Sequence, residues 1–137
     1  LTYNSHAFAC ATALAVLEVM EDEGLPERAA RLEAVQRQHM TRLREKHPCV
    51  KDFRAIGLFG ILDLQKNSAG EPTAPYNGSS EAMGAMNAFL REQGLFTFLR
   101  WGHVMCNPPL VITEEQLQEG WDIIDRGLDI VDSYFEG

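Results

Sequence analysis

Arg100 is the residue whose type and setting point most clearly to chemistry. It ends a run in which Phe96 and Phe98 alternate with aliphatic residues and threonine, and Trp101 follows it directly. A planar guanidinium at a strand end can bind a carboxylate or a sulfonate through two parallel hydrogen bonds. The alternative is an arginine paired with a nearby acidic side chain, and the sequence leaves both interpretations open.

Thr2 and Ser5 give a second signal for anion binding. Both hydroxyl residues precede an alanine-rich segment of helical composition. Hydroxyls and free amide groups at the beginning of a helix can bind an anion. An ordinary helix N-cap would use the same residues, so this alternative also stays open.

Three pairs of a histidine and a nearby cysteine have spacings that a metal ion could use. They are His6 with Cys10, His47 with Cys49, and His103 with Cys106. A structural zinc site needs four ligands in paired clusters, whereas these pairs are scattered. We therefore predict no metal site, and expect buried thiols and hydrogen-bonded histidines instead.

Composition restricts the classes of partner and the compartment. The chain has 137 residues, with 12 basic against 20 acidic side chains and a net charge of -8, which disfavours nucleic acid as a partner. No apolar run approaches the roughly 20 residues that a membrane-spanning helix needs, and the first residues do not have the order of a signal peptide. Three widely spaced cysteines favour free thiols in a reducing compartment, so we expect a cytoplasmic protein.

The hydrophobic periodicity predicts an α+β fold, a small and mostly antiparallel sheet covered by helices. Strands and helices do not alternate regularly, as they would in a doubly wound parallel sheet. Small side chains in the first helix suit close packing against other backbone. The predicted elements are a helix over 5–23 that ends at Gly24, a helix from 25 that ends at Pro48, one strand over 53–65, a loop over 66–78, a helix capped by Ser79 or Ser80 and ended by Gly94, strands over 95–100 and 103–106, and a final helix that begins with the capping box Thr113 to Gln116.

Four blocks of the sequence resemble, in the same order, the class III (omega) pyridoxal-phosphate-dependent aminotransferases. The blocks are LTYNSHAFACATALA (1–15), EGLPERAA (23–30), FRAIGLFGIL (53–62) and NPPLVIT (107–113). The resemblance implies a fold-type I enzyme, with residues 1–24 as the end of the large cofactor domain and a linking helix, and residues 25–137 as the C-terminal small domain. The segment LFTFLRW (95–101) is most similar to the taurine–pyruvate or beta-alanine–pyruvate group.

The resemblance also assigns roles to the two candidate anion-binding residues. Arg100 falls where the family receives the acid group of the substrate. Thr2 falls where the family contacts the phosphate of pyridoxal 5'-phosphate held by the neighbouring subunit, which implies a homodimer or a higher homo-oligomer. The implied substrates are an omega-amino acid or amine as amino donor and a keto acid such as pyruvate as acceptor.

The catalytic lysine of the family lies upstream of the block that contains Thr2. Lys46, Lys51 and Lys66 stand in none of the family's catalytic contexts, and the chain opens at Leu1 without a methionine. We therefore expect a C-terminal fragment with no catalytic residue of its own, inactive alone and prone to associate. A free-standing, non-catalytic binding or interaction domain of the same fold is the alternative.

Overall fold

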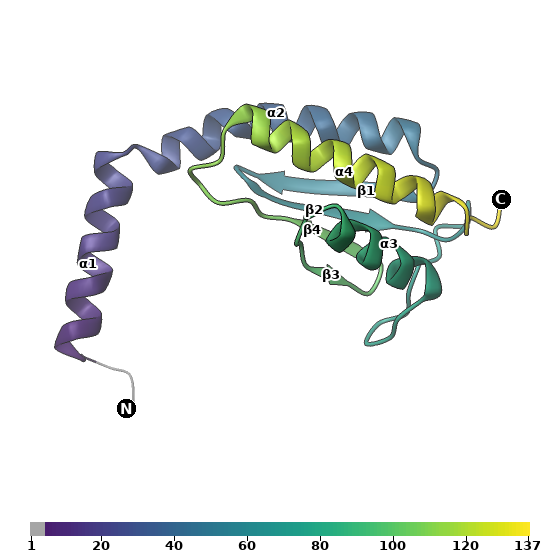
Figure 1. The fold of residues 1–137 in the computed structure, drawn as a ribbon, viewed down its shortest axis with the longest axis horizontal. Coiled ribbons are helices and arrows are strands. Elements are labelled where there is room, and N and C mark those ends of the chain that lie inside the picture. The colour runs from purple at the N-terminus through teal and green to yellow at the C-terminus, as the bar shows by residue number, and fades with distance from the viewer. Residues whose placement is uncertain (1–4) are drawn as a thin grey trace.

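The computed structural model describes residues 5–137 and has an α+β fold (Figure 1). Four strands form one antiparallel sheet in the order β1-β2-β4-β3, which confirms the predicted fold class. The elements are α1 (Ala7–Asp22), α2 (Leu25–Lys46), β1 (Val50–Ile56), β2 (Phe59–Leu64), α3 (Glu81–Glu92), β3 (Leu99–Arg100), β4 (His103–Cys106) and α4 (Glu114–Asp132).

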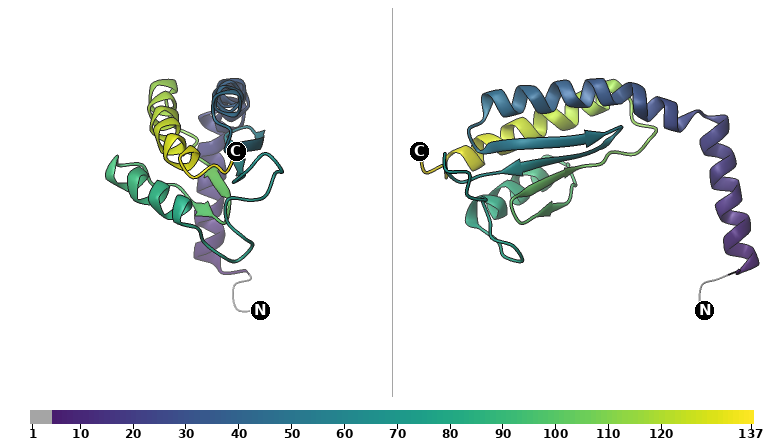
Figure 2. Two further views of the ribbon diagram at one scale, coloured as in Figure 1. Left: turned by 90° about the vertical axis from the view of Figure 1, so that its right-hand side faces the viewer. Right: turned by 180° about the vertical axis from the view of Figure 1, so that it is seen from behind.

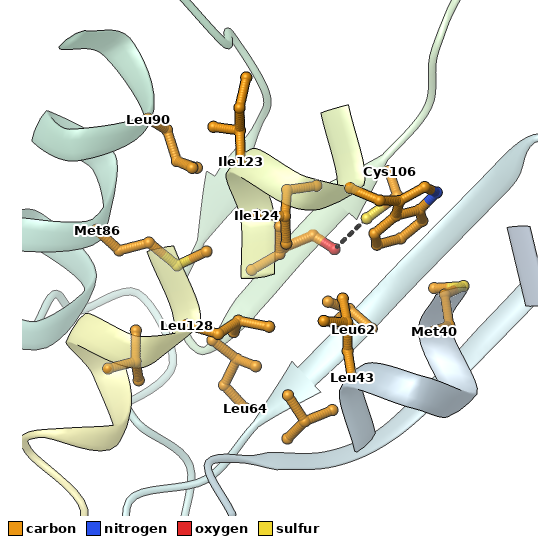
Figure 3. Packing of buried hydrophobic residues seen from close by; sticks show 14 of the residues in the cluster. Met40, Leu43, Leu62, Leu64, Met86, Leu90, Cys106, Ile123, Ile124 and Leu128 are labelled. Carbon is orange, nitrogen blue, oxygen red and sulfur yellow. Dashed lines mark hydrogen bonds between the residues drawn. The ribbon is translucent and has the colours of Figure 1, made fainter. Parts of the chain in front are cut away.

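Three helices, α2, α4 and α3, lie side by side over one face of the sheet (Figure 2). The strands alternate accordingly: Leu62 and Leu64 of β2 and Val104 of β4 are buried, whereas Phe59 of β2 is exposed. Met40 and Leu43 of α2 and Leu128 of α4 meet these strands in the core (Figure 3). The period of two in the strands and 3.6 in the helices thus directs one apolar side of each element to a common core.

The segment predicted as one strand over 53–65 is a hairpin, and that prediction was wrong. β1 and β2 pair antiparallel, with Ile56 opposite Phe59, around a turn at Gly57 and Leu58. Gly57 has φ +56, a left-handed conformation that glycine adopts without steric cost. The residues on both sides of this glycine are apolar, and the turn contains none of the usual Asn-Gly or Asp-Gly pairs. The sequence pattern therefore did not mark the end of the first strand.

The predicted strand over 95–100 is also shorter than expected. Only Leu99 and Arg100 form ladder pairs, opposite Val104 and His103. Phe98 still accepts a hydrogen bond from Met105 N at 2.9 Å, so the chain before β3 runs beside β4 without completing a regular ladder.

The beginnings of α3 and α4 and the ends of α1 and α3 agree with the predicted cap and stop residues. Ser80 accepts a hydrogen bond from Met83 N, and Thr113 with Gln116 forms both halves of the capping box of α4. Gly24 and Gly94 follow α1 and α3 with φ +59 and +80. Local hydrogen bonding by hydroxyl and amide side chains sets the beginnings of α3 and α4, as the sequence indicated.

Helix α1 points away from the rest of the molecule (Figure 1). None of its residues is buried, and Phe8, Leu14 and Leu17 are 77%, 58% and 60% exposed. Cys10 is exposed as well, so the expectation of buried thiols is wrong for this cysteine, because nothing in residues 5–137 covers the helix around it. Over these residues, no helix combines the length and the apolar character required to cross a membrane.

Candidate functional site

Arg100 lies at the end of β3, beside a tight turn that we call the Arg100 hairpin (residues 99–104). Arg100 pairs with His103 of β4, so Trp101 and Gly102 form the turn. Trp101 has φ +54, a left-handed conformation that costs a residue with a side chain roughly 1–3 kcal/mol. The turn therefore stores strain that the surrounding contacts must offset.

Gly102 fixes this turn against the end of β2. Its carbonyl oxygen accepts a hydrogen bond from Leu64 N at 2.7 Å. A Cβ atom on Gly102 would lie 3.0 Å from Leu64 O and 3.3 Å from Thr73 N, both backbone atoms with little freedom to move. Only glycine fits this close approach, and the approach sets where Trp101 and Arg100 lie.

Aromatic rings hold the Trp101 side chain. The ring of Tyr76, from the loop before α3, lies 4.3 Å from the Trp101 ring, measured between centroids, with the planes tilted by 43°. The His103 ring lies 6.2 Å away and faces Trp101 edge-on. These contacts oppose the backbone strain at Trp101.

The guanidinium of Arg100 lies over aromatic rings and is exposed to solvent. Its central carbon is 4.6 Å from the Trp101 centroid and 6.0 Å from that of Phe98. Within residues 5–137 Arg100 makes no ion pair, so the local acidic partner that the sequence left open is not found there. Stacking engages the faces of the guanidinium and leaves its N–H edges available to a carboxylate or sulfonate.

Segments from three of the four sequence blocks meet near the N-terminal half of α2. The Arg28 side chain donates hydrogen bonds to the carbonyl oxygens of Leu110, at 3.1 Å, and Ile112. Gly60 N donates to Asn107 Oδ1 at 3.3 Å. Blocks far apart in the chain therefore hold the segment after β4 in one position against α2 and β2.

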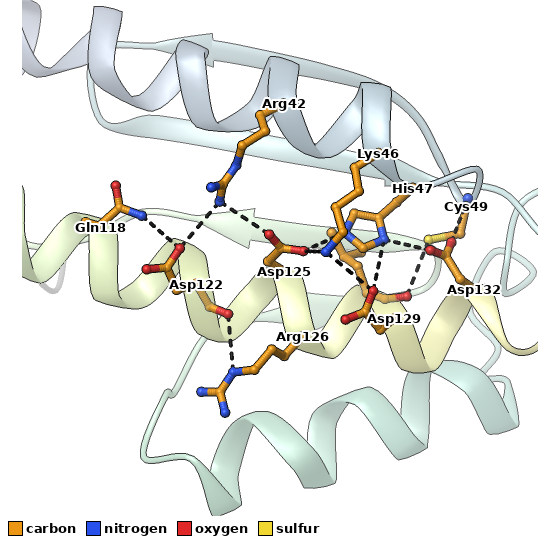
Figure 4. Close-up of polar contacts among 11 residues, drawn as sticks. Arg42, Lys46, His47, Cys49, Gln118, Asp122, Asp125, Arg126, Asp129 and Asp132 are labelled. Atoms are coloured by element: carbon orange, nitrogen blue, oxygen red, sulfur yellow. Dashed lines mark hydrogen bonds and ion pairs between the residues drawn. The ribbon is translucent and has the colours of Figure 1, made fainter.

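A second group of charged side chains joins the end of α2 to α4 (Figure 4); we call it the polar cluster. The imidazole of His47 is fully buried, with Nδ1 2.6 Å from Asp132 Oδ2 and Nε2 2.8 Å from Asp125 Oδ1. Lys46 bonds to Asp125 and lies 3.5 Å from Asp129. The members of the polar cluster are Arg42, Lys46, His47, Asp122, Asp125, Asp129 and Asp132.

The polar cluster includes an arrangement that could hold a metal ion, because ligand atoms of His47, Asp125 and Asp129 lie within 4.8 Å of one another. Both ring nitrogens of His47 already contact carboxylates, and Lys46 lies among the same oxygens. Burial raises the pKa of Asp125, but hydrogen bonds from Lys46 and His47 lower it by a larger amount. The pKa of Asp125 therefore lies below its ordinary value. The carboxylates are thus already compensated by protein cations, and we interpret the polar cluster as structural.

The histidine and cysteine pairs do not converge on a common centre. His6 and Cys10 are exposed on or next to α1. Cys49 and Cys106 are buried as predicted, and burial raises the pKa of both thiols, that of Cys106 to about 12. These two thiols are therefore neutral near pH 7 and poor nucleophiles or metal ligands.

None of the lysines has the environment of an amine that binds a cofactor covalently. Hydrogen bonds to Asp125 and Glu71 raise the pKa of Lys46 and Lys66, respectively. Lys51 is exposed and donates to Gly70 O at 2.9 Å. Such a role requires an amine whose pKa is lowered by burial or by neighbouring cations. Residues 5–137 therefore contain no lysine in an environment suited to a covalent bond with pyridoxal phosphate.

The second candidate, Thr2, lies outside the described residues. Ser5 is exposed with φ +59, and His6 is the N-cap of α1 without a side-chain hydrogen bond. Ser5 is therefore not the N-cap that the sequence suggested as an alternative.

Sequence reasoning missed Tyr76 and the special conformation of Trp101. The dipeptide Trp101-Gly102 between two short apolar strands is a hairpin signal, since glycine is common in such turns. Tyr76 lies in a polar loop distant from Trp101 in the sequence, and nothing local marks it as a ring that packs on the hairpin.

A family model described as Aminotransferase class-III matches residues 1–128. The chain is 29% identical over 126 residues to the 4-aminobutyrate aminotransferase of Mycobacterium leprae, which covers 91% of the chain and 27% of that protein. It is 30% identical to the isoleucine 2-epimerase of Lentilactobacillus buchneri, over 90% of the chain and 26% of that protein.

Among solved structures, the chain is similar to the taurine:2-oxoglutarate aminotransferase of Bifidobacterium kashiwanohense in complex with PLP and glutamate. The TM-score is 0.88 at 33% sequence identity, over 95% of this chain and 29% of that one. The match lies in the C-terminal part of such structures. The chain therefore spans between a quarter and a third of the length of these relatives.

Proposed function

Because this chain belongs to the class III aminotransferase family, we propose that it is the C-terminal part of an enzyme that transfers an amino group from an omega-amino acid or amine to a keto acid such as pyruvate. Residues 25–137 would form the small domain, and residues 1–24 a linking helix and the end of the cofactor domain. The exposed apolar side chains of α1 support this division, because they suit a surface that the rest of the enzyme covers.

Arg100 is our candidate for the residue that binds the acid group of the substrate. The observation that carries this role is the exposed guanidinium, held over Trp101 without an acidic partner in residues 5–137. Relatives are named for 4-aminobutyrate and taurine, which carry an amine at one end and a carboxylate or sulfonate at the other. A rigid guanidinium suits both anions, because each presents two oxygens to its N–H edges.

The whole enzyme would use pyridoxal 5'-phosphate, which supplies the electron sink for amino transfer when bound. This chain would contribute Thr2, as a hydroxyl toward the phosphate of the cofactor held by the partner subunit in a homodimer. Thr2→Ala should then weaken cofactor retention in the whole enzyme while leaving the fold intact. Unchanged retention during dialysis would contradict this role.

Family membership alone leaves the reaction open, since a relative of similar identity is named as an epimerase. The proposed reaction is tested with the protein that carries this chain, by measuring alanine formed from pyruvate with 4-aminobutyrate, taurine or butylamine as donor. We expect alanine from the acidic donors. Failure of every donor with both pyruvate and 2-oxoglutarate would contradict the proposed function.

A separate test concerns the 137 residues alone. If the chain were instead a free-standing binding domain, these residues would bind partners without any turnover. We expect no transaminase activity, no shift of cofactor absorbance and no lysine adduct after mixing with pyridoxal phosphate and borohydride. One stoichiometric reduced adduct followed by turnover with pyruvate would show that our interpretation of the lysines is wrong.

A further inference from the structure

Polar side chains form a row across the four strands, on the face of the sheet that is turned away from α2, α3 and α4 (Figure 2). In strand order the row is Asp52 of β1, Asp63 of β2, His103 of β4 and Arg100 of β3, and each residue lies opposite the next. Residues directly opposite each other in an antiparallel ladder have their side chains on the same face, with Cβ atoms about 4.5–5.5 Å apart. The row therefore brings an imidazole next to the candidate substrate-binding guanidinium.

The carboxylate of Asp63 lies against one nitrogen of the His103 ring. His103 Nδ1 is 2.8 Å from Asp63 Oδ1. Arg54 donates to both oxygens of the same carboxylate, at 2.9 and 3.0 Å, and so holds it in place. The His103 side chain is 35% exposed, and its Nε2 makes no ion pair or hydrogen bond within residues 5–137. Nε2 is therefore the nitrogen that a ligand can reach.

His103 and Arg100 border the same space. They are the residues on either side of the turn at Trp101 and Gly102, and both contact the Trp101 ring. The central carbon of the Arg100 guanidinium is 4.6 Å from the Trp101 centroid, and the His103 ring lies edge-on to the same ring at 6.2 Å. An acid group held by the guanidinium would therefore be within reach of His103 Nε2.

The charge of the His103 ring decides whether Nε2 attracts an acid group. A neutral imidazole with its proton on Nδ1 presents a lone pair at Nε2, whereas an imidazolium donates from both nitrogens. Histidine ordinarily changes charge between about pH 5 and 8. The other groups around the ring are carboxylates, guanidinium groups and a phenol, whose charge is ordinarily constant between about pH 6 and 8.5. They are Asp52, Asp63, Arg54, Arg100 and, across the Trp101 ring, Tyr76.

We propose that His103 is a second anion-binding residue, which acts with Arg100 on the acid group of the amino donor. The imidazolium donates from Nε2 to one oxygen of the acid group, and Asp63 accepts from Nδ1. Each oxygen of a carboxylate can accept more than one hydrogen bond, so the guanidinium and the imidazolium can bind it together. The proposal rests on the proposed role of Arg100. It adds a preference for acidic donors that falls as pH rises and the imidazolium loses its proton.

The test compares two donors in the whole protein that carries this chain. The half-reactions of 4-aminobutyrate and of butylamine are measured between about pH 6 and 8.5, where histidine loses its proton but the carboxylate of 4-aminobutyrate stays charged. Groups that act on the amine affect both donors alike, so their pH dependence cancels in the ratio of the two kcat/KM values. We expect this ratio to be about tenfold higher at the low end of the range, because a charge-assisted hydrogen bond is present only there. A ratio that does not change with pH would overturn the proposal.

His103→Phe keeps a ring beside Trp101 but cannot donate a hydrogen bond. It should lower the ratio at low pH about tenfold and abolish its pH dependence, while kcat/KM for butylamine changes little. The matched control is His39→Phe. His39 also contacts a tryptophan, Trp121 at 5.9 Å between centroids, but it belongs to α2, which covers the opposite face of the sheet. The same pH dependence in His103→Phe as in the unsubstituted protein would overturn the assignment to His103.

Binding of butyrate, an acid without an amine, provides a readout that needs no turnover. By calorimetry on the whole protein we expect butyrate to bind about tenfold more tightly at the low end of the pH range, and this difference to be lost in His103→Phe. Equal affinity at both ends of the range would overturn the proposal. Arg100→Ala separates this inference from the proposed function. If Arg100→Ala selectively slows 4-aminobutyrate but the ratio is independent of pH, only the role of His103 is wrong, whereas no selective effect of Arg100→Ala contradicts the role of Arg100 itself.

Discussion

The Arg100 hairpin and the polar cluster use cations in opposite ways. In the polar cluster, Arg42 and Lys46 form ion pairs with carboxylates of α4, and the fully buried imidazole of His47 lies between two of these carboxylates. At the hairpin, the Arg100 guanidinium is exposed over aromatic rings, next to a strained turn, and has no acidic partner in the part of the chain that the structure describes. The paired cations of the polar cluster hold α2 and α4 together. The Arg100 guanidinium, which aromatic rings hold in place without an acidic partner in the described residues, is available to a ligand.

The largest expected effect on stability comes from breaking the polar cluster. His47→Ala leaves the facing oxygens of Asp125 and Asp132 without their imidazole partner, next to a new cavity. Each hydrogen-bonding group left without its partner in a poorly hydrated site costs roughly 1–3 kcal/mol of unfolding free energy. Urea denaturation measures this loss. Arg100→Ala is the matched comparison and should change the same quantity by less than about 0.5 kcal/mol. Similar losses in the two variants would remove the distinction between the regions.

We expect the stability of the Arg100 hairpin to depend more on the backbone at Gly102 than on the charge of Arg100. Gly102→Ala places a Cβ 3.0 Å from Leu64 O, a backbone atom that cannot move aside without disturbing β2. We expect a loss of about 2 kcal/mol, as for other overpacked positions. The control is Gly120→Ala, whose Cβ would meet nothing within 4 Å. A Gly102→Ala midpoint equal to that of the control would mean that the turn is not fixed against β2.

A smaller loss is expected at the N-terminus of α4, the helix that carries the aspartates of the polar cluster. Thr113→Ala removes the hydroxyl that accepts from Gln116 N and should cost about 1 kcal/mol. Thr113→Ser keeps this acceptor and should retain most of the stability. An unchanged denaturation midpoint in Thr113→Ala would show that the cap contributes nothing.

The smallest effect is a pH dependence that belongs to the polar cluster. The pKa of Asp125 is lower in the folded chain than its ordinary value of about 3.9. The stabilisation is therefore present above that value and is lost as pH falls through the lower, folded pKa. Asp125→Asn should unfold with a shallower dependence on pH below about 4. The measurement is the free energy of unfolding against pH for the unsubstituted chain and for Asp125→Asn. The same dependence on pH in both would contradict this contribution of Asp125.

Local signals were sufficient to predict much of this fold. The capping box at Thr113 and Gln116, the cap at Ser80 and the glycines after α1 and α3 depend on residues a few positions apart, and all are confirmed. The strand over 53–65 failed because the turn at Gly57 lies inside a continuous apolar run. Sequence patterns mark element ends well only where a specific turn or cap residue is present.

The candidate site was predicted only in part, for a related reason. The position of Arg100 at a strand end is confirmed by β3. The contact of Tyr76 with Trp101 and the contacts of His47 with two aspartates, 78 and 85 residues away, depend on tertiary packing. Neither contact leaves a periodic or local pattern in the sequence, so only the fold reveals which of these side chains meet.

The central claim is that Arg100 recognises the acid group of a substrate, and a paired rate measurement tests it most directly. In the protein that carries this chain, kcat/KM is measured for the half-reactions of 4-aminobutyrate and of butylamine, which has no acid group, with Arg100 and with Arg100→Ala. We predict that the substitution lowers kcat/KM for 4-aminobutyrate about ten- to a hundredfold, equivalent to about 1.5–3 kcal/mol, and leaves butylamine nearly unchanged. An equal loss for both donors, or no loss for either, would contradict the claim.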